Sequence, residues 1–168
     1  MKTRSLTGWV VFLTLLLPAG SEACSCAWAG PLLKVAPAAE VVLRAKVLSH
    51  HGRSRGVELA MDVEVQEVFK GAAKASRLRI WGDNGAQCRP YVSAFPVQTE
   101  WIFAISKLTG EKVRDGDYFI SVCGDYWARV GNDHVSGRLS SPLPPSVTDK
   151  PEKISMTEFR ERLRTAGK

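Results

Sequence analysis

The chain lacks the short motifs that mark the common classes of enzyme. It has no nucleophile elbow, no metalloprotease helix motif and no glycine loop that would hold a phosphate. Histidine is scarce, and all three copies (His50, His51 and His134) fall in segments that we predict to be solvated turns. We therefore expect no catalytic residues, no enzymatic activity and no cofactor.

Lysine and arginine never gather into a long cluster, although the formal net charge is +6. A basic surface of this kind is compatible with a polyanionic matrix or an acidic protein. Ordinary solubilising charge is the simpler interpretation. We predict no nucleic-acid partner.

The chain also lacks an apolar run of the ~20 residues that a membrane-spanning helix needs. A short apolar run at 9–17 follows Lys2 and Arg4 and is followed by small residues that end at Ala23. This pattern predicts a secretory signal peptide over residues 1–23, removed by cleavage before Cys24. A retained anchor and a lipoprotein signal that acylates Cys24 are the alternatives. We expect a secreted, extracellular protein without a transmembrane anchor, or a periplasmic or cell-surface protein in a bacterium.

Removal of residues 1–23 from the 168-residue chain leaves 145 residues, the length of one domain. We place that domain at 24–140. The proline-rich stretch that follows predicts a stiff linker over 141–154. Ser155 and Glu158 have the spacing of a capping box, and Phe159 and Leu163 are four residues apart. An amphipathic C-terminal helix is therefore predicted within 155–168, packed on the rest of the domain, with Arg160, Arg162 and Arg164 on a solvated face.

Only four cysteines are present: Cys24, Cys26, Cys88 and Cys123. In an oxidising compartment an even number favours disulfides. A bridge between the two ends of Cys24-Ser25-Cys26 would be strained, which leaves two of the three possible connectivities. A structural zinc site is the competing interpretation, but such sites use cysteine pairs spaced differently.

Alternating apolar residues predict a mainly β fold. A polar, glycine-bounded turn is expected at 50–56, and a short helical turn at 31–36. Five or six short strands in a single basic domain favour a small closed barrel or a sandwich. Five predicted strands lie at 41–47, 57–65, 78–80, 101–105 and 118–122.

Several segments together resemble the N-terminal domain of the tissue inhibitors of metalloproteinases, within the wider group of netrin-like modules. They are Cys24-Ser25-Cys26, 41–47, 67–71, Ala86-Gln87-Cys88, 100–104 and 120–123. The resemblance covers most of 24–127. It implies a five-stranded Greek-key barrel of the OB type, with the N-terminal segment held across it. It also implies that Cys24 pairs with Cys88 and that Cys26 pairs with Cys123.

The resemblance further implies a function in trans on a zinc metalloprotease. The α-amino nitrogen and carbonyl oxygen of Cys24 would bind the metal of the target, and Ser25 would enter the adjoining specificity pocket. Such a target needs a zinc ion with an open coordination position, and the amine must be neutral. The residues implied to contact the target are Cys24, Ser25, Cys26, Ala27, Gly85, Ala86 and Gln87.

The chain also departs from the family pattern. It has no third disulfide in this domain and no cysteine-rich C-terminal domain. Trp28 introduces a large aromatic beside the implied contact edge, either as an anchor for a partner or as packing over the barrel. The alternative function is an extracellular netrin-like binding module that recognises a protein or a polyanion, for example through Arg53 and Arg55, without inhibiting a protease.

Overall fold

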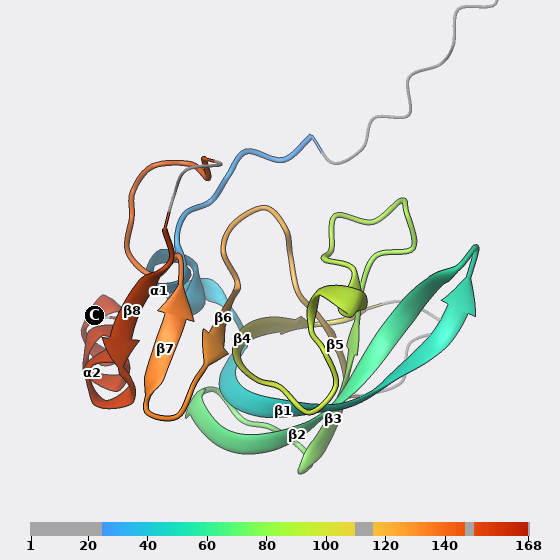
Figure 1. Cartoon of the computed structure of the whole chain (residues 1–168), viewed down its shortest axis with the longest axis horizontal. Helices are drawn as coiled ribbons and strands as arrows, with labels where there is room; N and C mark the ends of the chain where they lie inside the picture. Colours follow the sequence, from blue (N-terminus) through green and yellow to red (C-terminus); the bar gives the residue numbers. More distant parts are fainter. Residues whose placement is uncertain (1–24, 110–115, 147–149, 168) are drawn as a thin grey trace, which may run out of the picture.

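A computed structural model describes residues 25–109, 116–146 and 150–167 (Figure 1). Cys24 and the predicted signal peptide lie outside the described residues. Within the described part the fold is mainly β, with eight strands joined in one sheet. The short helix α1 (Leu32–Val35) precedes the strands, and the longer helix α2 (Met156–Ala166) follows them.

Five of the strands close into a barrel. They are β1 (Val41–Ser54), β2 (Val57–Lys70), β3 (Arg77–Trp81), β4 (Glu100–Lys107) and β5 (Asp117–Phe119). The order is β1-β2-β3-β5-β4, and a further pairing of β1 with β4 completes the ring. Only the β3–β5 pair within this ring is parallel. This arrangement confirms the predicted five-stranded barrel of the OB type.

Strands β1 and β2 form a hairpin that extends beyond the barrel (Figure 1). Near the barrel their apolar residues alternate inward, as predicted for 41–47 and 57–65. The turn predicted at 50–56 was too wide, because pairing continues through His50↔Met61 and Arg53↔Glu58. Only Arg55 and Gly56 connect the strands, both with positive φ. A two-stranded ribbon exposes both faces, so its polar residues do not prevent strand pairing.

The histidines lie in strands, which corrects the prediction of solvated turns. The His50 side chain is only 12% exposed and its ring nitrogens contact Glu58 (2.7 Å) and the carbonyl of Phe95 (2.9 Å). His51 uses the same Nε2 for Ser49 Oγ (2.9 Å) and for Asp62 (2.7 Å). A serine–histidine–aspartate relay needs the two partners on opposite ring nitrogens, so these contacts do not form one.

Three further strands extend the sheet beyond the barrel. They are β6 (Trp127–Val130), β7 (His134–Gly137) and β8 (Glu152–Ser155), which continue in order from β4. β6 pairs with residues 100–103 of β4, while β5 pairs with Ser106 and Lys107. The sequence did not predict these strands, and the first three residues of β8 fall in the segment 141–154 that was interpreted as a linker. β5 is also shorter than the predicted strand at 118–122, which continues as the connection to β6.

Apolar side chains fill the barrel and also cover part of its outer wall. Phe95, which follows the 3-10 turn η2 (Val92–Ala94), is fully buried inside the barrel. Outside, Val42, Ile102 and Ala104 pack against α1 and α2 in a second core, and the turn η1 (Ala36–Ala38) joins α1 to the barrel. The predicted helices are therefore confirmed, and α2 packs on the wall of the barrel. Neither helix, nor any other in the described residues, is long and apolar enough to cross a membrane.

Candidate functional site

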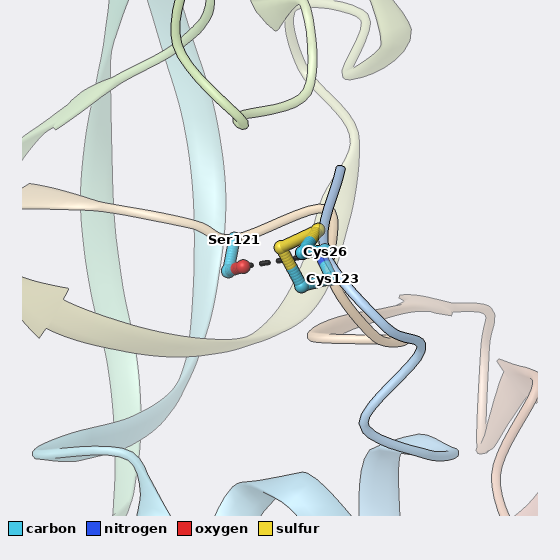
Figure 2. Close-up of a disulfide and its surroundings, with 3 residues drawn as sticks. All are labelled: Cys26, Ser121 and Cys123. Atoms are coloured by element: carbon cyan, nitrogen blue, oxygen red, sulfur yellow. Dashed lines mark hydrogen bonds between the residues drawn. A yellow bond between two sulfur atoms is a disulfide. The ribbon is translucent and has the colours of Figure 1, made fainter. Parts of the chain in front are cut away.

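A disulfide fixes the start of the described chain to the barrel. Cys26 bonds to Cys123, with 5.6 Å between their Cα atoms, across 97 residues of sequence (Figure 2). Cys123 lies in the connection from β5 to β6, where its backbone N–H donates to Ser121 Oγ (3.0 Å). The pairing of Cys26 with Cys123, implied by the family resemblance, is confirmed. A disulfide also fits an oxidising, extracellular setting.

Backbone hydrogen bonds continue this attachment after Cys26. The Ala29 N–H donates to the carbonyl of Cys123 (2.6 Å), and the Asp125 N–H donates to the carbonyl of Gly30 (2.9 Å). Further along, Leu32 N–H donates to the carbonyl of Arg138 (3.0 Å). The N-terminal segment therefore lies against the β5–β6 connection and the start of the β7–β8 connection, and its backbone is hydrogen-bonded up to the start of α1.

Trp28 belongs to this attachment. Its indole N–H donates to Asp125 Oδ2 (3.1 Å), and the Arg138 guanidinium lies over its ring, 5.6 Å from the centroid. Arg138 also pairs with Asp125 at 3.3 Å. Burial raises the pKa of the Asp125 carboxyl, and hydrogen bonds and charge from Trp28 and Arg138 oppose that rise. Trp28 is therefore half-buried and held by intramolecular contacts through both its ring and its N–H.

A third sulfur lies beside the disulfide. The Sγ atoms of Cys26, Cys88 and Cys123 all fall within 4.8 Å of one another. Among the described residues Cys88 has no disulfide partner. Cys24 is outside them, so its pairing with Cys88 stays a prediction. Two residues of chain span up to about 7 Å, which gives Cys24 the reach to Cys88. Two of the three sulfurs are consumed by the disulfide, so the trio does not offer the thiolates of a zinc site.

The loop that ends at Cys88 is held in shape by its first residue. Asp83 Oδ1 accepts from the backbone N–H groups of Gly85 (2.9 Å), Ala86 (3.1 Å) and Gln87 (2.8 Å). Gly85 has φ +95°, a conformation that glycine adopts without strain. The end of this loop is hydrogen-bonded to the β5–β6 connection that carries Cys123, because the Val122 N–H donates to the carbonyl of Cys88 (3.1 Å).

The structure brings most of the predicted contact residues to one edge. Ser25, Cys26 and Ala27 are exposed, and so are Gly85, Ala86 and Gln87 on the loop that leads to Cys88. Cys24 lies outside the described residues. Asp83 lies before Asn84-Gly85 in a recognisable turn signal, but its carboxylate was not among the predicted site residues. Asp125 and Arg138 were not predicted either, because their contacts with Trp28 join distant parts of the chain and leave no local pattern.

Comparison with known proteins does not assign the chain to a family. No model of a protein family matches it, and no curated protein matches it significantly.

Proposed function

We propose that the chain is a secreted inhibitor of zinc metalloproteases that acts through the α-amino nitrogen and carbonyl oxygen of Cys24. The observation that carries this proposal is the gathering of the sulfurs of Cys26, Cys88 and Cys123 within 4.8 Å. A bridge from Cys24 to Cys88 would then hold the first mature residue beside a segment that is already fixed. The resemblance to the tissue inhibitors of metalloproteinases supports the same mechanism.

The chemistry requires a neutral amine and a preorganised chelating pair. An α-amino group has a pKa of ~7.7–8.0, so a substantial fraction is neutral near physiological pH. Zinc in a protease with three protein ligands keeps a position for an incoming nitrogen or oxygen. The Cys26–Cys123 bridge and the paired backbone of 29–32 hold the segment in place before binding. Prior ordering reduces the entropy lost on association.

The exposed residues beside Cys24 would make the remaining contacts. Ser25 would enter the specificity pocket next to the zinc, and Ala27 would continue along the cleft. The loop residues Gly85, Ala86 and Gln87 would contact the other side. Asp83 holds their backbone in a fixed shape, which again favours binding without rearrangement.

The experiment adds one alanine before Cys24 of the mature protein. Inhibition of a secreted zinc endopeptidase with a three-histidine metal site is measured with a quenched fluorescent peptide. The extension converts the amine into an amide, so we expect inhibition to be lost while the thermal transition is unchanged. The matched control carries the extra alanine after Lys168 and should inhibit normally. Equal inhibition by both extended forms would refute the mechanism.

The covalent state of the mature N-terminus is a second test. Mass spectrometry of the secreted protein should give unmodified Cys24 as the first residue, linked to Cys88. An acylated Cys24, or a different first residue, would contradict the proposal because neither leaves the required amine.

A binding module for polyanions is the second candidate, supported by the end of the β1–β2 hairpin. Arg53 and Arg55 are exposed there, and neither forms a salt bridge in the part of the chain that the structure describes. On α2, by contrast, Arg160 pairs with Glu67 (2.9 Å) and Arg162 with Glu158 (2.5 Å). Binding to heparin that weakens steeply with salt and is lost in the Arg53→Gln/Arg55→Asn variant would favour this candidate. The alanine extension before Cys24 should leave such binding unchanged.

A further inference from the structure

We propose that a cavity behind the loop 83–87 binds a small organic acid, with Arg89 holding the carboxylate and an apolar wall holding the rest of the molecule. The cavity has a volume of about 300 Å³ and is lined by residues of β2, β3 and β5, by this loop and by the residues that follow β4. This proposal is independent of protease inhibition. The residues that carry it are Leu59, Trp81, Asn84, Gln87, Arg89 and Leu108.

Among the described residues, the Arg89 guanidinium forms no hydrogen bond and no salt bridge. Its guanidinium carbon lies over the ring of Phe119, 5.0 Å from the centroid, and the side chain is partly buried. Burial lowers the pKa of Arg89, and only the charge of Asp83 opposes this. A guanidinium offers five N–H donors in a plane that suits a carboxylate. Arg89 lines the cavity, so a carboxylate bound there would give these donors an acceptor.

Asp83, whose charge acts on Arg89, and Asp117, which lines the cavity, already accept hydrogen bonds from other groups. Asp83 Oδ1 accepts three backbone N–H groups of its own loop. Asp117, which also lines the cavity, is only 7% exposed and accepts from the Trp81 indole N–H (2.9 Å). Its charge acts on Arg79. Neither acid neutralises Arg89 by direct contact, so a ligand carboxylate would not have to displace one.

The rest of the lining limits what the ligand can be. Leu59, Leu108 and the Trp81 ring form an apolar wall, and the amides of Asn84 and Gln87 lie at the cavity as further hydrogen-bonding groups. Ligand cavities of about 300 Å³ are at the small end of the usual range. One cationic side chain beside an apolar wall suits a ligand with one carboxylate and a small apolar group. A polyanion would need several cations along an open surface.

The probe for the test is phenylacetate, and its neutral amide, phenylacetamide, is the matched control ligand. Each is titrated into the secreted protein, and the NMR signals of the Trp81 indole N–H and the Arg89 side-chain N–H are followed. We expect a saturable shift with phenylacetate in the millimolar range or below. The amide should bind at least about ten times more weakly, because it cannot form charge-assisted hydrogen bonds. Equal binding of acid and amide, or no saturation up to about 10 mM, would overturn the proposal.

Variants then test the residue. Arg89→Gln should weaken phenylacetate binding about tenfold or more, and Arg89→Lys should weaken it less, since lysine keeps the charge and loses the planar donor pair. Arg164→Gln, which removes an exposed arginine on α2, should bind as the unaltered protein does. Near-ultraviolet circular dichroism checks that each variant is folded. Unchanged affinity in Arg89→Gln would overturn the assignment, and the acid–amide comparison decides the proposal even if that variant does not fold.

Discussion

Phe95 shows how one residue outside the strands organises the interior of the barrel. Its ring makes edge-on contacts with Trp101, Phe103 and Trp127, at centroid distances of 5.0, 5.3 and 5.6 Å. Aromatic pairs in this geometry add to the free energy gained by burying their surface. Phe95 therefore links β4 to β6 from the inside, although it belongs to neither strand.

We expect Phe95→Ala to lower the free energy of unfolding by about 3–5 kcal/mol, since a fully buried ring is replaced by a cavity. Denaturant unfolding measures the effect. Tyr91→Ala is the control four residues earlier, where the side chain is 46% exposed and the change should be small. A loss similar to that of Tyr91→Ala would show that the ring is not packed as described.

The ion pair of Asp62 makes the free energy of unfolding depend on pH. A hydrogen bond from Arg79 is the main cause that lowers the pKa of Asp62, and His51 also contributes. Because the folded-state pKa lies below the unfolded value, the contribution is full above the unfolded pKa of ~3.9. It is lost as the pH falls through the folded-state pKa.

Asp62→Asn should therefore remove at most about 1 kcal/mol of stability at neutral pH, because the ion pair is partly exposed. The difference from the unaltered protein should shrink as the pH falls through the lowered folded-state pKa of Asp62. Unfolding curves measured between pH 7 and pH 2 test this, with Glu64→Gln as the neighbouring control. A difference that stays constant across the whole range would contradict the electrostatic explanation.

At the scale of single residues, the sequence predicted what depends on local pattern. The alternation of Val57, Leu59, Met61 and Val63 identified the inward side of β2 near the barrel, where Met61 and Val63 are fully buried. The environment of His50 could not be predicted, because it depends on the carbonyl of Phe95, 45 residues away. Arg89 likewise carries no local signal, since its proposed role depends on a cavity lined by distant segments.

The helix α2 is the element whose ends were predicted best. Ser155 caps it, with Oγ accepting from the Glu158 N–H at 3.1 Å. Glu158 pairs with Arg162 (2.5 Å). Phe159 and Leu163 are buried on the barrel wall, and Phe159 meets Phe69 edge-on at 5.6 Å.

Ser155→Ala should lower the free energy of unfolding by about 1 kcal/mol, because it leaves a helix N–H without its acceptor. Ser155→Asp, which restores an acceptor, should recover most of this loss. Thr157→Ala, on the exposed side of the first turn, is the matched control. Equal stability of the Ser155→Ala and Thr157→Ala variants, measured by denaturant unfolding, would argue against the cap.

The missed elements share a physical reason. Strands β6, β7 and β8 are four residues each and mix charged, glycine and apolar residues. In strands this short, the local sequence pattern contributes little to strand formation. They form because the edge of β4 pairs with β6, and β6 then pairs with β7, which pairs with β8. The parallel pairing of β3 with β5 is likewise a product of barrel closure. The number and type of the barrel strands could be predicted, whereas the strands added to the barrel could not.

For the whole molecule, the largest single constraint is the Cys26–Cys123 bridge. Cross-linking residues 97 apart in sequence should stabilise the fold by about 4–5 kcal/mol on the chain-entropy view. We expect the double variant Cys26→Ser/Cys123→Ser to lose stability on that order, as measured by denaturant unfolding. Changing both residues avoids leaving a thiol beside Cys88.

The proper control for that variant is the unaltered protein with a strong thiol reductant. It should approach the stability of the double variant and should lose further stability if Cys24 is bonded to Cys88. A double variant as stable as the oxidised protein would mean that the bridge does not restrict the unfolded chain.

The same bridge divides the chain into a part that a pulling force can extend and a part that it cannot. All five barrel strands lie between Cys26 and Cys123, inside one covalent ring, whereas β6, β7, β8 and α2 lie outside it. Tension applied between Cys26 and the C-terminal end can therefore extend only the chain that follows Cys123, and a single backbone cut inside the ring leaves its two fragments attached. A molecule pulled at these points would release the outer strands and α2 and then stop lengthening, with the barrel still shielded from the force.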